Sequence, residues 1–140
     1  AVLAEMGARV FTIEIVEELA RSARRALSET GYTNVHVRAG DGYRGWPEHA
    51  PFDAVGVTAA PDVVPAPLLE QVAVGGVLVA PIGTTNQSIV VYARSEKGFS
   101  ISTNIPVRFV PMTGEATNRL GRTHRDETKR NPRPASGNIR

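Results

Sequence analysis

Hydrophobic residues occur along this chain in short segments whose spacing alternates between that of helices and that of strands. Residues 16–30 carry apolar side chains at helical spacing, which predicts one buried face: Val16, Leu19, Ala20, Ala23 and Leu27. The β-rich segments 9–14, 34–39 and 52–59 predict strands before and after this helix. A second, short helix with prolines at its start is predicted at residues 65–72.

The last predicted strands follow one another without a helical pattern between them. Residues 76–83 (GVLVAPIG), after the turn at Gly75-Gly76, form a near-continuous apolar run, typical of a strand buried on both faces. Segments 87–94 and 99–110 follow, and the turn at Lys97-Gly98 predicts an antiparallel hairpin. Residues 1–6 look like the end of a helix that Gly7 caps in the left-handed conformation. The order predicts an α/β fold, a doubly wound sheet with antiparallel strands at its C-terminal edge.

Composition narrows the class of protein without naming a function. With 140 residues, a 41% hydrophobic and a 21% charged fraction, the chain is expected to form one soluble domain. It has no cysteine, and its three histidines are far apart in sequence, so no metal site is expected. No apolar run approaches the roughly 20 residues that span a bilayer, and no signal peptide is visible. We therefore expect no membrane partner and a cytoplasmic location.

The charge is unevenly distributed. Residues 1–112 hold nine Lys and Arg against eleven Asp and Glu, whereas residues 113–140 hold seven against three. This basic tail has only Leu120 and Ile139 as large aliphatic residues, so we expect a folded part over 1–112 and a disordered tail over 113–140. The tail also lacks aromatic residues that could stack on bases, so a nucleic-acid partner is not expected.

Two predicted strands end in acidic residues, and in open α/β sheets ligands bind beyond the carboxyl ends of strands. Glu14 ends the first strand, where a carboxylate can accept hydrogen bonds from both hydroxyls of a ribose; alternatively it is an ordinary acid at a helix start. Asp41 follows the next strand between Gly40 and Gly42, and it suits an exocyclic amine such as that of adenine. Its alternative is a tight turn. Together the two acids bracket an adenosine and favour S-adenosylmethionine over a nicotinamide cofactor.

The third strand ends in small residues, Thr58, Ala59 and Ala60. They leave room for a substrate backbone, and the threonine offers a hydroxyl. No aromatic residue is present here to stack a base, which argues against enzymes that methylate amino groups of bases. The alternative is a strand end that leads into a proline-marked loop. Trp46 and Phe52 nearby are interpreted as hydrophobic cover of the adjoining loop, with ligand contact as the alternative.

Four segments together resemble one enzyme family: GARVFTIE, GYTNVHVRAGDGYRGWPEHAPFDAVGVTAA, LLEQVAVGGVLVAPIG and VRFVPMTGE. They occur in order over residues 1–115 and are similar to protein-L-isoaspartate O-methyltransferases. The resemblance implies a class I, Rossmann-like methyltransferase fold with S-adenosylmethionine as donor and S-adenosylhomocysteine as product. It implies as substrate the free carboxylate of L-isoaspartyl or D-aspartyl residues in damaged proteins, whose methylation starts their repair.

The resemblance also implies roles for individual residues. Glu14 would bind the ribose, Ile15 would pack on adenine, and Asp41 with Gly42 would form the turn on the adenine side. Thr58 and Ala59 would line the place where methyl and carboxylate meet. Four consecutive residues would lie along the substrate peptide: Val107, Arg108, Phe109 and Val110.

One part of the family pattern is missing from this sequence. The family has a glycine-rich donor-binding motif and a substrate loop upstream of the segment that begins here at Ala1. We therefore expect an N-terminally truncated sheet and hypothesise that the isolated chain binds the donor weakly and is inactive. The alternatives are an inactive remnant or a basic-tailed binding module, and a nicotinamide-binding half-domain that would leave Asp41 and VRFVPMTGE unexplained.

Overall fold

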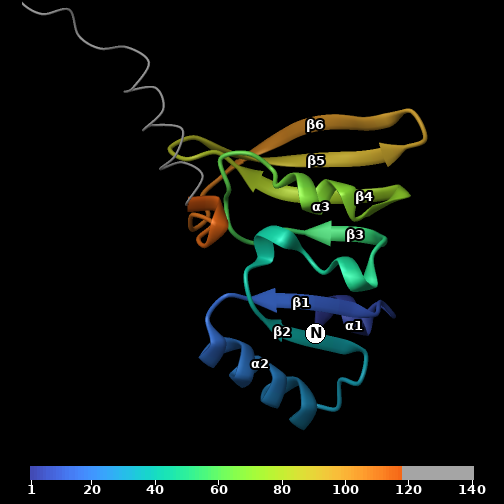
Figure 1. The fold of residues 1–140 in the computed structure, drawn as a ribbon, viewed down its shortest axis with the longest axis vertical. Coiled ribbons are helices and arrows are strands. Elements are labelled where there is room, and N and C mark those ends of the chain that lie inside the picture. Colours follow the sequence, from blue (N-terminus) through green and yellow to red (C-terminus); the bar gives the residue numbers. More distant parts are fainter. Residues whose placement is uncertain (118–140) are drawn as a thin grey trace, which may run out of the picture.

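The computed structural model describes residues 1–117, apart from the side chain of Asn104. Most of the predicted basic tail, residues 118–140, lies outside this range. The described elements follow the predicted order (Figure 1): α1 (Val2–Glu5), β1 (Val10–Glu14), α2 (Glu17–Glu29), β2 (Val35–Ala39), the 3₁₀ turns η1 (Gly42–Arg44) and η2 (Pro47–His49), β3 (Phe52–Gly56), α3 (Ala66–Glu70), β4 (Val72–Ile82), β5 (Gln87–Ser95) and β6 (Gly98–Val107). None of the helices in residues 1–117 is long and apolar enough to cross a membrane.

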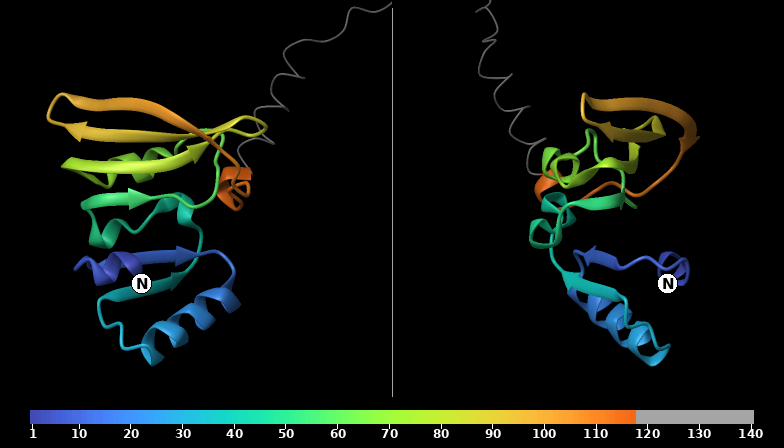
Figure 2. Two further views of the ribbon diagram at one scale, coloured as in Figure 1. Left: turned by 180° about the vertical axis from the view of Figure 1, so that it is seen from behind. Right: turned by 90° about the vertical axis from the view of Figure 1, so that its right-hand side faces the viewer.

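The strands form two sheets. Strands β1 and β2 pair in parallel, with Glu14 opposite Ala39 at their carboxyl ends. The second sheet has the order β3-β4-β5-β6; β3 and β4 are parallel, and the other pairs are antiparallel, as predicted for the C-terminal edge. Strands β1 and β3 lie side by side without a ladder between them (Figures 1 and 2). The predicted α/β architecture is confirmed, but the expected sheet is interrupted between these two strands.

A glycine follows each of the first two helices, and the cap predicted at Gly7 is present. Gly7 follows α1 with φ of 88°, and Gly31 follows α2 with φ of 83°. Both glycines accept a left-handed conformation that a side chain disfavours, and the backbone N–H of Tyr32 donates to the carbonyl of Leu27 across the end of α2. The sequence therefore ends both helices where predicted.

The apolar face of α2 is less buried than its periodicity predicts. Ala20 is fully buried against the small sheet, but Leu19 is 57% exposed and Val16 is also exposed. The physical reason is that α2 covers a sheet of only two strands, which offers too little surface for the whole face. The prediction of a fully buried face is therefore wrong for Val16, Leu19 and Ala23, which are all exposed.

The pair Gly75-Gly76 forms part of a strand, which corrects the predicted turn before residue 76. Strand β4 begins at Val72, and Phe52 and Ala54 of β3 pair with Val72 and Val77, so a bulge absorbs the extra residues. Gly75 has φ of 85°. A Cβ at Gly76 would lie 2.7 Å from the carbonyl oxygen of Asp53, so the close approach of the two strands requires a glycine there.

The main core lies between α3 and the larger sheet. Its buried members are Leu68, Val72, Leu78 and Ala80. The apolar run predicted to be a strand buried on both faces does form a strand, and Leu78 and Ala80 on one face are fully buried. On the other face Val79 is 37% exposed, so the prediction of burial on both faces is wrong. This core fixes β3 and β4, and with them the strand end at residues 57–60.

The last two strands form the predicted hairpin, and β6 then leaves the sheet earlier than predicted. Ser95 pairs with Gly98 at the tip, and Gln87 pairs with Val107 at the base. The strand ends at Val107 rather than at residue 110. Beyond it, Pro111 forms an isolated parallel bridge with Ala60. The chain therefore turns from the edge of the sheet toward the end of β3.

Candidate functional site

The carboxyl ends of β1, β2 and β3 lie on the same side of the molecule, where residues 113–117 also lie (Figure 1). Parallel pairing produces this arrangement, because it brings equivalent strand ends to one edge. We refer to residues 107–115, which cross this edge, as the closing segment. Its contacts with the strand ends define the candidate site.

Glu14 lies at the end of β1, partly buried. One carboxylate oxygen, Oε1, accepts a hydrogen bond of 2.9 Å from the backbone N–H of Val16, the residue that directly precedes α2. The main-chain carbonyl of Glu14 accepts from the N–H of Gly40, so the ends of β1 and β2 are joined. Oε2 accepts no hydrogen bond within residues 1–117. Next to it Ile15 is 45% exposed, an apolar side chain beside a carboxylate oxygen that can accept.

Asp41 begins η1, two residues beyond β2, and holds two backbone groups at once. Its Oδ1 accepts from the N–H of Tyr43 at 2.9 Å, which is the geometry of a helix cap. Its Oδ2 accepts from the N–H of Glu115 at 2.7 Å. Each oxygen retains a further lone pair for a ligand. The structure therefore places Glu14 and Asp41 at neighbouring strand ends and gives Asp41 a structural contact that sequence reasoning missed.

Gly114 lies in close contact with the same carboxylate of Asp41, where no other residue would fit. It has φ of 85°, and a Cβ on it would overlap Asp41 Oδ2. The guanidinium of Arg44 pairs with the carboxylate of Glu115 at 2.8 Å, and this hydrogen bond raises the pKa of Arg44 above its ordinary value. The DGYR and TGE stretches of the sequence are thus partners in space, 71 residues apart between Arg44 and Glu115.

The closing segment also meets the end of β3. The N–H of Ala60 donates to the carbonyl of Val110, and the N–H of Met112 donates to the carbonyl of Ala60, both at 2.8 Å. Strand β3 ends at Gly56, before the predicted residue 59, although the N–H of Val57 still donates to the carbonyl of Val79. Thr58 is exposed and Ala59 is partly buried. Thr58 and Ala59 therefore directly precede the residue, Ala60, that pairs with residues 110–112.

The four residues predicted to face a peptide differ in exposure. Val107 is partly buried at the end of β6, and the next three are exposed, with Phe109 at 37% and Val110 at 69%. The backbone of this stretch is nevertheless held, because the side chain of Gln87 bonds both the N–H and the carbonyl of Phe109. A free apolar surface on a fixed backbone can contact another chain.

Two buried glutamines were not singled out by sequence reasoning. Gln87 holds Phe109, and Gln71 accepts from the N–H of Trp46 and donates to the carbonyl of Arg44, both at 2.8 Å. Each is nearly inaccessible. The sequence gives no signal for either residue, because Gln87 lies among the polar residues 84–88 and Gln71 directly follows an acidic residue.

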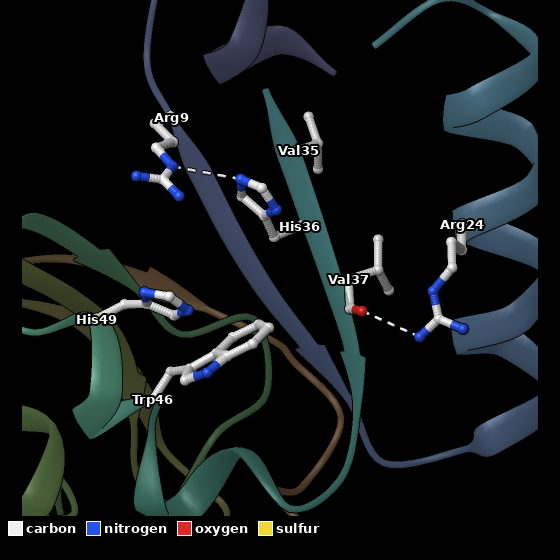
Figure 3. Close-up of a pocket in the computed structure, with 7 residues that line it drawn as sticks. All are labelled: Arg9, Arg24, Val35, His36, Val37, Trp46 and His49. Carbon is white, nitrogen blue, oxygen red and sulfur yellow. Dashed lines mark hydrogen bonds between the residues drawn. The ribbon is translucent and has the colours of Figure 1, made fainter. Parts of the chain in front are cut away.

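A cavity of about 520 Å³ lies at the opposite, amino end of β1 and β2 (Figure 3). Its lining includes Arg9, Arg24, His36, Trp46 and His49. Arg9 donates to the imidazole of His36, and Arg24 donates to the carbonyl of Val37, as the dashed lines show. The cationic groups that line the cavity are thus already bonded within the protein.

Aromatic packing explains the residues around this cavity. The ring of Phe11 stacks on His36 at 4.9 Å and on His49 at 4.3 Å between centroids, and it meets Trp46 and Phe52 edge-on or tilted. The interpretation of Trp46 and Phe52 as hydrophobic cover is consistent with these contacts. His49 has partners that its sequence context did not reveal. In residues 1–117, no three His, Cys, Asp or Glu side chains are grouped so as to hold a metal ion.

Comparison with known proteins identifies a family for the described part of the chain. A family model described as Protein-L-isoaspartate(D-aspartate) O-methyltransferase matches residues 1–117. The chain belongs to the protein-L-isoaspartate O-methyltransferase family. The resemblance inferred from the four sequence segments is therefore confirmed over the described part of the chain.

Two curated relatives of the family show how much of it this chain represents. The protein-L-isoaspartate O-methyltransferase of Gloeobacter violaceus is 56% identical over 117 residues, which cover 82% of this chain and 57% of that protein. The relative from a Picosynechococcus species is 52% identical over 116 residues, covering 83% of this chain and 52% of that protein. The chain spans about half the length of the curated relatives it matches.

Solved structures agree on the fold. A protein-L-isoaspartate O-methyltransferase superposes with a TM-score of 0.75 at 27% identity, covering 82% of this chain and 37% of that one. A Plasmodium falciparum structure, titled as a putative member of the family in complex with S-adenosyl-L-homocysteine, superposes with a TM-score of 0.66 at 21% identity and covers 80% of this chain and 56% of that one. The second likeness concerns the fold alone.

Proposed function

We propose that this chain forms the adenosine-binding strand ends and the substrate-facing segment of an S-adenosylmethionine-dependent methyltransferase. Its substrate is the free carboxylate of L-isoaspartyl or D-aspartyl residues in damaged proteins, and the predicted compartment is the cytoplasm. The observation that carries the proposal is the closing segment, which is tied to Asp41 after β2 and to Ala60 after β3. Family membership supports this assignment.

The strand ends fit an adenosine. Oε2 of Glu14 accepts no hydrogen bond within residues 1–117 and is available to ribose hydroxyls. Asp41 with Gly42 offers remaining lone pairs for an exocyclic amine, and the exposed side chain of Ile15 offers an apolar face for a flat ring. Membership of a methyltransferase family supports a methyl donor of this class.

The proposed reaction needs no proton transfer by a side chain of the protein. S-adenosylmethionine supplies an electrophilic methyl group on its sulfonium and leaves as S-adenosylhomocysteine. The carboxyl group of the substrate has an ordinary pKa of about 4 and is ionised at neutral pH, so it needs no general base. Thr58 and Ala59 leave space at the strand end, and residues 107–110 lie along the peptide. Orientation of two bound reactants can supply roughly 7–11 kcal/mol of the barrier.

The chain alone and a chimera test the proposal. In the chimera, residues 1–117 replace the matching stretch of the Gloeobacter violaceus protein, which supplies the rest of the family domain. We expect the chimera to methylate an isoaspartyl peptide and not the same peptide with normal aspartate. We expect the 140-residue chain alone to bind S-adenosylhomocysteine weakly in calorimetry and to be inactive.

Glu14→Gln is the matched variant for the donor site. The amide oxygen can still cap Val16, but Oε2 becomes an NH₂ group that cannot accept from a ribose. We expect normal folding by circular dichroism and weaker binding of S-adenosylhomocysteine by the chimera. A folded chimera without methyl transfer would refute the proposal and favour a remnant or a binding module.

A further inference from the structure

Gln87 is the first residue of β5, and its side chain is 9% exposed. The amide oxygen accepts a hydrogen bond of 2.6 Å from the N–H of Phe109, and the amide nitrogen donates to the carbonyl of Phe109 at 3.1 Å. The same nitrogen donates to the carbonyl of Thr84 at 3.3 Å. One buried side chain therefore satisfies both backbone groups of a single residue in the closing segment.

This pairing continues the sheet by means of a side chain. The backbone ladder between β5 and β6 ends where Gln87 pairs with Val107. Two residues later, the amide of Gln87 bonds Phe109 as a neighbouring strand would, with one donor and one acceptor. One residue further on, the carbonyl of Val110 accepts a hydrogen bond from the N–H of Ala60. Gln87 is thus the bridge between the end of the ladder and the contact with β3.

Side-chain burial holds this stretch only in part, since none of its side chains is fully buried. Arg108 is exposed, and Phe109 and Val110 keep 37% and 69% of their surface accessible. A segment without a buried side chain depends on its backbone hydrogen bonds for a fixed position. At Phe109 those bonds come from Gln87 alone among the described residues.

We propose that Gln87 is a positioning residue that sets the place of residues 107–110 against the end of β3 and thereby the affinity for the substrate peptide. The inference rests on the proposed function, which assigns the peptide to this stretch. The Gln87 side chain bonds Thr84 and Phe109 and none of the residues assigned to the donor. Its loss should therefore raise KM for the peptide and leave KM for the donor unchanged.

Gln71 provides the matched control. It is equally buried and also bonds backbone groups in both directions, but its partners are Arg44 and Trp46. Gln71→Leu removes a comparable pair of hydrogen bonds without touching Phe109. An effect that follows from lost stability in general should appear in both variants, whereas a positioning effect should appear at Phe109 only in Gln87→Leu.

Hydrogen exchange on the 140-residue chain tests the positioning directly, without any activity. We expect the amide of Phe109 to exchange about tenfold faster in Gln87→Leu, because its acceptor is gone, and to exchange normally in Gln71→Leu. Gln87→Met serves if the leucine variant does not fold, since it keeps the length of the side chain and also lacks both the acceptor and the donor for Phe109. Unchanged exchange at Phe109 in the folded variant would overturn the inference.

The chimera with the Gloeobacter violaceus protein tests the consequence for the substrate. In Gln87→Leu we expect a raised KM for the isoaspartyl peptide and an unchanged KM for the donor, because only the stretch assigned to the peptide loses its hydrogen bonds to Gln87. An equal rise of KM in Gln71→Leu would overturn the inference, and an inactive unsubstituted chimera would instead refute the proposed function, with exchange at Phe109 still deciding the positioning.

Discussion

Replacing Asp41 with asparagine separates the structural role of this residue from the charge it offers a ligand. The carboxylate accepts from the N–H of Tyr43 with one oxygen and from the N–H of Glu115 with the other. Asparagine is nearly the same size but has a single acceptor oxygen. In Asp41→Asn, one of the two N–H groups must therefore face an NH₂ group.

The expected cost follows from these two bonds. A hydrogen bond to a charged group contributes about 1.5–3 kcal/mol, against about 1 kcal/mol for a neutral one. Losing one bond and weakening the other should lower the free energy of unfolding by about 2–4 kcal/mol. A domain of this kind has a total stability of roughly 5–15 kcal/mol, so the loss is a large fraction of it.

Urea denaturation followed by circular dichroism measures this loss. Asp53→Asn is the matched control, because its carboxylate is exposed and accepts no hydrogen bond within residues 1–117. The control should stay within about 0.5 kcal/mol of the unsubstituted chain. Hydrogen exchange should also show faster exchange of the Glu115 amide in Asp41→Asn, since the closing segment loses its tie to β2.

Equal stability of the Asp41 and Asp53 variants would refute this reasoning. It would mean that the bond between Asp41 and Glu115 does not hold the closing segment in solution. Weakened binding of S-adenosylhomocysteine by the variant chimera, without loss of stability, would assign Asp41 to the ligand alone.

Three further changes probe the frame around the site. Gly45→Ala should lower the thermal midpoint more than Gly31→Ala. Both glycines have positive φ, but a Cβ at Gly45 would lie 2.5 Å from the amide oxygen of Gln71, which is buried and held by two hydrogen bonds. Similar midpoints of the two variants would contradict that contact. Leu78→Ala, at a fully buried position, should cost about 2–5 kcal/mol in urea denaturation, and a cost below 1 kcal/mol would show that the core is not packed as described. The hydroxyl of Tyr32 donates to the carboxylate of Glu5 in α1, and this hydrogen bond raises the pKa of Tyr32 above 10.0. The bond should therefore contribute fully to stability below that pH, and the contribution should disappear as the pH rises through the raised pKa. Absorbance titration should show the raised pKa, and Tyr32→Phe should remove the alkaline dependence of stability.

Local features of the sequence determined most of the secondary structure. Gly7 and Gly31 end helices because their left-handed conformation excludes side chains, and that requirement is visible without any partner. The apolar run around Leu78 predicted a buried strand because few other structures can bury so many consecutive apolar residues. The acids at the ends of β1 and β2 were identified because the carboxyl edge of a parallel sheet is the usual place for a ligand.

Tertiary structure decided how these elements pair and how deeply their side chains are buried. The bulge at Gly75 and the early end of β6 depend on neighbouring strands, whose register no local pattern contains. The exposed Leu19 depends on how much sheet lies beneath α2.

The contacts of the closing segment show the same limit most clearly. Asp41 and Glu115 are 74 residues apart, and Gln87 and Phe109 are 22 apart. A carboxylate or an amide can bond any available backbone group, so its residue type specifies the chemistry but not the partner. The sequence by itself predicted which groups would bind an adenosine and a peptide. Only the folded chain selected which of them also hold the site together, because that choice depends on distances between segments that are remote in sequence.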